Sequence, residues 1–342
     1  MASHRRPKQP SRTRVTVLTA TAAAAVALTS QAAQADEKPT KKEVKAKVDK
    51  LYEEAEKATE KYNGAKEQQK KLEGEIDKLQ DQVARGQDEL NELRDSLGSM
   101  ASAQYRSGGI DPTVQLFLSS DPDTYLDKAS TLDQLTAKQA GALEKIQDKQ
   151  RTLAQQRKEA TQKLKDLDET REELGKKKKE VQGKLGEAQK LLNTLTAKER
   201  QALAAEDARA SRAAGDRVDL GNSPKGSGIA MAAFQAAQSK IGSPYVYGAA
   251  GPGSFDCSGL TSWAYAQAGA SIPRTSQAQA SYGTRISSQS DLRVGDLVIF
   301  YGDLHHVGFY AGNGQVLHAP KPGAVVRYES INNMPYMFGV RI

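Results

Sequence analysis

Mostly apolar residues recur every seven positions across the first third of the chain. One series runs Val48, Ala55, Tyr62, Gln69, Ile76, Val83, Leu90 and Leu97, and a second runs Val44, Leu51, Ala58, Ala65, Leu72, Leu79, Gly86, Leu93 and Met100. The two series are offset by three and four positions, which is the a/d pattern of a coiled coil sustained for about eight heptads. The pattern therefore predicts a long coiled-coil helix, which has no room for an active site.

A second helix is predicted by a further seven-residue series, Ile146, Leu153, Ala160, Leu167, Leu174, Val181, Ala188 and Leu195. Between the two helices, Gly108-Gly109, Asp111-Pro112 and Asp121-Pro122 interrupt helical structure. We expect an antiparallel helical hairpin over residues 36–212, with the apolar segment Val114 to Leu118 at its tip. Continuous arms would be roughly 95 Å and 130 Å long. Gly64, Gly74 and Gly86 weaken the seam, since each costs a helix about 1 kcal/mol relative to alanine.

Residues 1–35 have the composition of a secretory signal peptide. Five basic residues precede an apolar run, and Ala33-Gln34-Ala35 forms a cleavage site. The alternative is a retained membrane anchor, but the run is short and consists mostly of Ala and Thr. We therefore expect a secreted protein, with the choice between Sec and twin-arginine export left open.

The charge balance changes when this leader is removed. The whole chain carries a net charge of +7, and loss of the five basic residues leaves +2. The basic balance is therefore no evidence for nucleic-acid binding. The chain has one cysteine, Cys257, so an exported protein of this sequence has no internal disulfide and depends on its core for stability.

Composition changes again near residue 213. Gly, Ser, Pro and Asp collect in a linker over residues 213–227, and a globular domain follows over 228–342. Two helical segments, closed by Gly242 and Gly269, precede five short β-like runs, DLVIF, HVGFYAG, QVLHA, AVVRYE and MFGVRI. Helices followed by strands indicate an α+β domain with an antiparallel sheet.

Cys257 begins one of these helices, with Ser254 or Asp256 as its expected cap. The N–H groups and dipole at a helix start stabilise a thiolate, which is the form of cysteine that acts as a nucleophile. The alternative is a buried, inert side chain. The histidines outside the leader are His305, His306 and His318, in the same domain as the thiol. Their spacing matches neither H-x-H nor H-x-x-x-H, so we expect no metal site and no cofactor.

His306 and His318 lie on successive predicted strands. They share a face of the sheet only if the hairpin around AGNG has an odd loop, for example residues 312–314, so that residue 308 pairs with 318. A two-residue turn on Asn313-Gly314 would put the two rings on opposite faces. Because side chains alternate along a strand, His305 should face the opposite way from His306, and its ring should pack or face solvent.

The segments GSPYVYGAAGPGSFDCSGLTSWAY, IPRTSQAQ, VGDLVIF and HHVGFYAGNGQVLHAP occur in this order. They resemble the NlpC/P60 peptidoglycan endopeptidases, which have a papain-like core, over about a third of the chain. The resemblance implies that Cys257 is the nucleophile, His306 its base and His318 the residue that orients the base. It implies an oxyanion role for Tyr245, and substrate binding by Asp256, Ser258, Arg274 and Ser276. The implied substrate is the stem peptide of peptidoglycan, cut between D-glutamate and the following diamino acid.

The predicted hairpin resembles, less specifically, the regulatory coiled coils of division-associated wall hydrolases. This implies that residues 40–212 occlude the active site and engage an ABC-type membrane complex. Two alternatives stay open. The hairpin could make the chain an adaptor or activator of wall hydrolysis, with a C-terminal domain that only binds the wall. The same papain-like core could also serve an amidase that cuts the bond between sugar and alanine.

Overall fold

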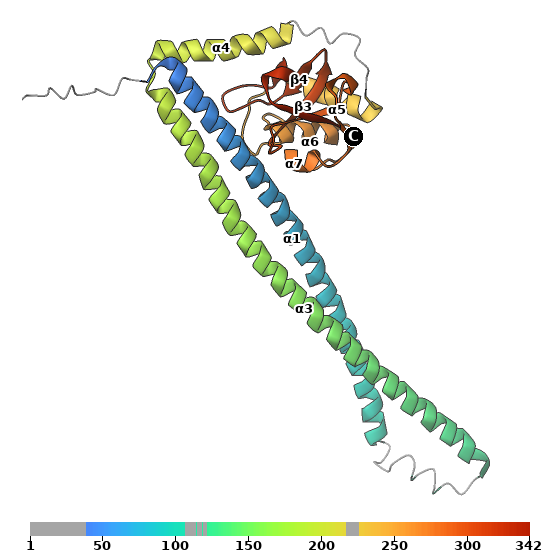
Figure 1. The fold of residues 1–342 in the computed structure, drawn as a ribbon. Coiled ribbons are helices and arrows are strands. Elements are labelled where there is room, and N and C mark those ends of the chain that lie inside the picture. Colours follow the sequence, from blue (N-terminus) through green and yellow to red (C-terminus); the bar gives the residue numbers. More distant parts are fainter. Residues whose placement is uncertain (1–38, 107–113, 115–117, 119–121, 217–225) are drawn as a thin grey trace, which may run out of the picture. The chain divides into compact units, whose positions relative to one another are not determined.

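The two predicted long helices form an antiparallel pair. The computed structural model describes residues 39–106, 114, 118, 122–216 and 226–342, with α1 over Lys41–Arg106 and α3 over Pro122–Asn193 (Figure 1). Leu167 packs between the α1 residues Leu72 and Ile76, and farther along the pair Leu90 meets Ile146 and Leu153. The predicted hairpin is confirmed. The proposed leader, most of the apolar tip and residues 217–225 of the proposed linker lie outside the described residues.

The second arm of the hairpin is shorter than the expected 130 Å. A break at residues 194–196 separates α3 from α4, which spans Ala197–Asp216. Thr196 and Glu199 form a capping box: the Thr196 N–H donates to the Glu199 carboxylate at 2.8 Å, and the Glu199 N–H donates to Thr196 Oγ1 at 3.3 Å. This box satisfies the first N–H groups of a new helix, so the heptad pattern does not continue as a single rod.

Gly86 has a packing role that its low helix propensity conceals. A Cβ atom at this position would lie 2.7 Å from Cδ2 of Leu153 on α3. The missing side chain therefore lets the two helices approach closely at this level. Gly74 lies in the same helix with no atom within 4 Å of such a Cβ, and there the glycine only costs helix stability.

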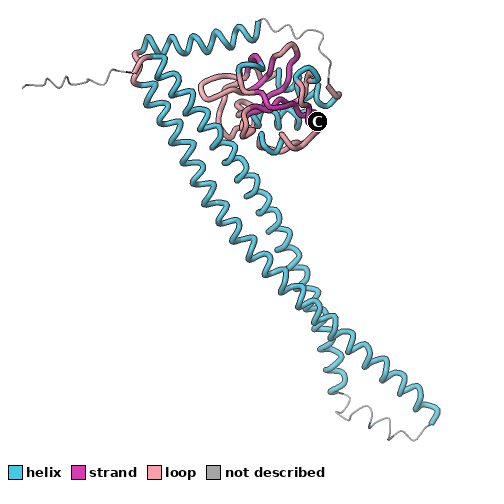
Figure 2. Tube along the Cα trace, viewed as in Figure 1, coloured by secondary structure: helices cyan, strands magenta, loops and turns pink. Residues whose placement is uncertain are grey.

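Six strands form one antiparallel sheet in the C-terminal part (Figure 2). They are β1 (Thr284–Ile286), β2 (Leu297–Phe300), β3 (His306–Gly312), β4 (Gln315–His318), β5 (Arg327–Ser330) and β6 (Tyr336–Arg341), in the order β1-β6-β2-β3-β4-β5. The five predicted runs correspond to β2 to β6. The short edge strand β1 was not predicted.

Helices α5 (Gly228–Gln238), α6 (Cys257–Gln267) and the single turn α7 (Ser276–Gln279) complete this part, with 3₁₀ turns at Gln289–Asp291 and Ile331–Asn333. Phe234 of α5 and Tyr265 of α6 both pack on Phe309 of β3, with ring centroids 6.2 Å and 5.8 Å apart. These contacts bury one face of the sheet beneath the helices. The predicted α+β class with an antiparallel sheet is confirmed.

The turn between β3 and β4 differs from the predicted three-residue loop. Asn313 and Gly314 form a two-residue turn, both with positive φ (53° and 70°), between the paired residues Gly312 and Gln315. The register shifts by one residue between Tyr310 and Gly312, so β3 carries a bulge. Because the bulge supplies the odd residue, a two-residue turn leaves His306 and His318 on one face. The expectation that such a turn separates the rings is wrong.

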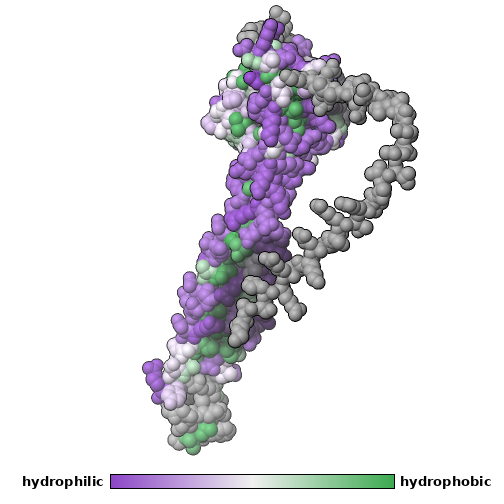
Figure 3. Space-filling view, turned by 90° about the vertical axis from the view of Figure 1, so that its left-hand side faces the viewer, coloured by the Kyte–Doolittle hydropathy of each residue, from purple (hydrophilic) through white to green (hydrophobic). Residues whose placement is uncertain are grey.

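The long helices are strongly polar on the outside. The face in view in Figure 3 is predominantly hydrophilic along their length, with scattered apolar positions. Among the described residues, no helix combines the length and apolar character that a membrane crossing requires. Residues 40–342 form one compact unit, and this unit includes α1 and the C-terminal sheet.

Candidate active site

Cys257 is held at the first position of α6 by the residue before it. The Asp256 side chain caps the helix by accepting from the Gly259 N–H at 2.7 Å. Asp256 also accepts two hydrogen bonds from Arg274, at 2.7 Å and 3.0 Å. One buried carboxylate therefore fixes both the helix start and the guanidinium. Of the two expected caps, Asp256 is the one used, and Cys257 is 1% exposed.

His306 and His318 meet as the sheet register requires. Nε2 of His306 lies 2.7 Å from Nδ1 of His318, and Nε2 of His318 lies 3.3 Å from the Glu329 carboxylate on β5. Burial lowers the pKa of His318 to about 4, so this ring is neutral at pH 7. We assign the His306 Nε2–H as donor to His318 Nδ1, and the His318 Nε2–H as donor to Glu329. Glu329 completes a chain that sequence reasoning missed.

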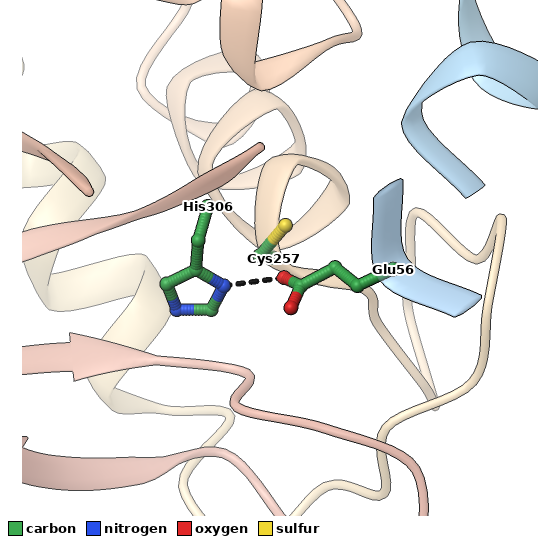
Figure 4. A group of neighbouring side chains, drawn as sticks. All are labelled: Glu56, Cys257 and His306. Carbon is green, nitrogen blue, oxygen red and sulfur yellow. Dashed lines mark hydrogen bonds and ion pairs between the residues drawn. The ribbon is translucent and has the colours of Figure 1, made fainter. Parts of the chain in front are cut away.

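Helix α1 contributes a carboxylate to this group. Glu56 accepts a hydrogen bond from Nδ1 of His306, the nitrogen turned toward Cys257 (Figure 4). A carboxylate oxygen of Glu56, the Cys257 sulfur and a ring nitrogen of His306 all lie within 4.8 Å of one another. Burial alone would lower the pKa of His306, but the Glu56 carboxylate outweighs it and the pKa is raised. Nδ1 of His306 is therefore hydrogen-bonded to Glu56 and is not free to accept a proton from Cys257 in this arrangement.

Glu60, one turn farther along α1, enters a cradle of hydrogen-bond donors. Its carboxylate accepts from Ser258 Oγ at 2.6 Å, from the Ser276 N–H at 2.6 Å and from Ser276 Oγ at 2.9 Å. Burial, together with the nearby Asp256 carboxylate, raises the pKa of Glu60 to about 7. Ser258 and Ser276 therefore form a cradle that binds a carboxylate. Oε1 of Glu60, which occupies this cradle, lies 3.9 Å from the Cys257 sulfur.

The thiol is not activated in this arrangement. Burial raises the pKa of Cys257 well above its ordinary value, and the carboxylates of Glu56, Glu60 and Asp256 raise it further. The expectation of a thiolate at the helix start is therefore wrong while α1 lies against the site.

The remaining predicted residues lie in or beside the same group. Tyr245 is buried, and its pKa is raised by burial and by the charges of Glu56 and Cys257. His305 points away from the site. Its ring stacks on Tyr301, with centroids 4.2 Å apart, and its Nδ1 bonds Asp303. The expectation that the His305 ring packs is confirmed.

Sequence reasoning missed the residues of α1 that reach the site. Glu56, Glu60 and Asn63 are spaced by four and three positions, so they share one face of the helix outside both heptad series. Asn63 Nδ2 donates to Asp256 at 3.1 Å. Polar residues at this spacing usually form a solvated helix face, so the pattern by itself does not reveal a buried contact.

Comparison with known proteins supports the resemblance in this part of the chain. The model of the NlpC/P60 family matches residues 242–338. A probable endopeptidase of Corynebacterium glutamicum is 54% identical over 111 residues, which are 32% of this chain and 53% of that protein. Probable endopeptidase p60 of Listeria monocytogenes is 49% identical over 98 residues, which are 28% of this chain and 20% of that protein.

The crystal structure of the NlpC/p60 domain of the peptidoglycan hydrolase SagA is 38% identical, with a TM-score of 0.31, and the match covers 33% of this chain and 98% of that one. The chain spans about half or less of the length of the two curated relatives. The family match covers the helix and strands that carry Cys257, His306 and His318. The C-terminal part of this chain belongs to the NlpC/P60 family.

Proposed function

We propose that the chain is a peptidoglycan endopeptidase with a cysteine nucleophile, and that α1 holds it in a closed form. The observation that carries this proposal is the alignment of Cys257 at a helix start with the hydrogen-bonded chain of His306, His318 and Glu329. A nucleophile, a base and a group that orients the base are the components that acyl transfer through a thiol requires.

The reaction begins once Glu56 has left the space between thiol and imidazole. Nδ1 of His306 takes the Cys257 proton, and the sulfur attacks the amide carbonyl. The Tyr245 hydroxyl donates to the oxyanion of the tetrahedral intermediate. His306 then protonates the leaving amine, and a water molecule, deprotonated by the same imidazole, hydrolyses the thioester. His318 and Glu329 hold the ring in the tautomer that makes both proton transfers possible.

The carboxylate cradle favours one bond of the stem peptide. D-glutamate is linked through its side chain, so it bears a free α-carboxylate a few bonds from the carbonyl that is cut. Ser258 and Ser276 bind a carboxylate beside the sulfur, with Arg274 anchored nearby by Asp256. The bond between sugar lactyl and alanine has no such carboxylate. The cradle therefore supports cleavage after D-glutamate over the amidase alternative.

The closed form follows from what α1 places in the site. Glu60 fills the carboxylate cradle and Glu56 occupies the base, so substrate binding and proton transfer are both blocked. We propose that export brings the protein to the cell wall, and that an ABC-type membrane complex acting on the helical hairpin withdraws α1. Peptidoglycan would then reach Cys257.

Digestion of purified peptidoglycan followed by mass spectrometry of the products tests this function. The Glu56→Ala/Glu60→Ala chain should release fragments that end in D-glutamate and fragments that begin with the diamino acid. The same chain with Cys257→Ala is the control and should release neither. Products ending at the sugar lactyl group would show an amidase. Full function of a Cys257→Ala chain in cells would support the adaptor alternative.

A further inference from the structure

Three side chains of different chemistry converge where α1 meets the active site. The Cys257 sulfur, a His306 ring nitrogen and a Glu56 carboxylate oxygen lie within 4.8 Å of one another, and all three residues are buried. They come from α6, β3 and α1 (Figure 4). Sulfur, imidazole nitrogen and carboxylate oxygen are the donors that Zn²⁺ uses in proteins.

We propose that Glu56, Cys257 and His306 form a Zn²⁺ site that exists only in the closed form and fastens α1 to the peptidase domain. The proposal extends the closed form described above. Three protein ligands leave the fourth tetrahedral position for water. On binding, the thiol proton and the proton shared by His306 and Glu56 pass to solvent, and the sulfur coordinates as thiolate.

The charges around the three ligands favour a cation. Glu56, Glu60 and Asp256 bring three carboxylates into one buried region, and Arg274 is held by both oxygens of Asp256. A divalent cation with one thiolate and one carboxylate ligand is electrically neutral. This removes much of the cost of burying negative groups together.

His318 and Glu329 form a hydrogen-bonded chain with the ring nitrogen of His306 that faces away from Cys257, as hydrogen-bond partners of metal-bound histidines commonly do. Nε2 of His306 faces His318 at 2.7 Å, and His318 in turn faces Glu329. Such a chain fixes the ring orientation and leaves the other ring nitrogen, Nδ1, available as a ligand. The geometry that serves the base in the open form therefore also serves a metal in the closed form.

Glu56 is the ligand that couples zinc binding to closure of the site by α1. Without it, thiol and imidazole offer only two ligands, which hold zinc far more weakly than three. Because Glu56 belongs to α1, zinc affinity is coupled to closure, and each raises the other. A chelator should therefore ease the release of α1.

Titration of the full chain with Co²⁺ as a spectroscopic substitute for Zn²⁺ tests the site. The wild-type chain should bind one equivalent, with the intense visible bands of tetrahedral cobalt and a thiolate-to-cobalt charge-transfer band, and Zn²⁺ should displace it. Glu56→Gln should weaken binding by tenfold or more. Glu60→Gln, which changes a neighbouring carboxylate outside the ligand set, should retain the spectrum.

Thermal unfolding of the same full-length variants gives a second readout. Zn²⁺ should raise the midpoint of the wild-type chain and leave that of Glu56→Gln unchanged, since ligand binding to the folded form stabilises it. Equal cobalt affinity in wild-type and Glu56→Gln chains, or no charge-transfer band in either, would overturn the proposal. Neither readout requires catalysis. The zinc proposal can therefore be disproved while the proposed peptidase function is retained, and the peptidase function can be disproved while the zinc proposal is retained.

Discussion

At the scale of single residues, two carboxylates of α1 block the proposed peptidase site. Glu56 holds the imidazole nitrogen that would receive the Cys257 proton, and Glu60 holds the donors that would bind substrate. The pKa of the thiol is raised by burial and by these same carboxylates. Cys257, His306 and His318 of the proposed catalytic group could be identified from the sequence, but the state of this group depends on α1 residues about 200 positions earlier.

The orienting chain behind the base can be tested in the open background, the Glu56→Ala/Glu60→Ala chain. His306→Ala should lower kcat by about 100-fold or more, the typical contribution of a positioned base. His318→Ala should lower kcat by about tenfold with little change in KM, because it acts on ring orientation and not on substrate. Steady-state hydrolysis of a stem-peptide substrate measures both. An unchanged kcat in His318→Ala would remove it from the mechanism.

The titration of Glu60 predicts how closure depends on pH. Its pKa is about 7 in the closed form, above its ordinary value of 4.5, because it is buried beside Asp256. Without bound Zn²⁺, closure therefore takes up a proton, and the closed form loses stability as pH rises from about 4.5 through 7. The raised pKa of His306, paired with Glu56, acts in the same direction, since that pair is lost when the ring deprotonates.

The ratio of wild-type activity to Glu60→Gln activity, measured with a chelator that keeps Zn²⁺ off the site, isolates this effect, because titration of the thiol affects both chains. Glu60→Gln keeps the shape of the side chain without its charge, so its closure should vary less with pH. Wild-type activity relative to Glu60→Gln should rise between pH 5 and 7.5. A ratio that is flat across this interval would show that Glu60 does not titrate in the closed form.

At the scale of elements, the strands and main helices could be predicted because their signals are local. Short β-like runs indicated β2 to β6, and the heptads indicated α1 and α3. The β3–β4 register was predicted correctly, with residue 309 facing 317, but through the wrong loop. A bulge leaves no local pattern, because it is selected by how the strand packs on its neighbours. Thr196-x-x-Glu199 matches the capping-box pattern, so the sequence does carry a local signal for the start of α4.

Two glycines of α1 make a matched test of the helix pair. Gly74→Ala should raise stability by up to about 1 kcal/mol, because it improves helix propensity in open space. Gly86→Ala gains the same propensity but forces Leu153 to move, and overpacking costs about 1–3 kcal/mol. The free energies of urea unfolding of the two variants should therefore differ by about 1–3 kcal/mol, with Gly86→Ala the less stable. Equal stabilisation would show that the helices do not approach closely there.

At the scale of the whole molecule, α1 uses two faces for two purposes. Its heptad positions pack on α3, and the stripe of Glu56, Glu60 and Asn63 packs on the NlpC/P60 domain. The hairpin and the NlpC/P60 domain were each predictable, but this contact was not. It joins residues far apart in sequence through polar groups, and a polar helical stripe carries no sign of which surface will cover it.

Exposed ion pairs at this contact should contribute modestly to closure. Lys321, in the loop after β4, donates to Asp49 of α1 at 2.6 Å, with both side chains partly exposed. Such pairs are worth about 0.2–1 kcal/mol and are weakened by salt. Lys321→Ala should raise basal activity by up to about fivefold. Lys163→Ala, which removes the Lys163–Glu75 pair between α3 and α1, is the control and should leave activity unchanged.

The central claim is that α1 closes a working cysteine peptidase, and the rate of peptidoglycan hydrolysis by the full chain tests it most directly. Glu56 and Glu60 each make charge-assisted hydrogen bonds worth about 1.5–3 kcal/mol, and 1.4 kcal/mol is tenfold in an equilibrium. Glu56→Ala/Glu60→Ala should therefore release product at least about ten times faster than wild type, and not at all once Cys257→Ala is added. Equal rates for the wild-type and double-variant chains, or hydrolysis that survives Cys257→Ala, would contradict the account.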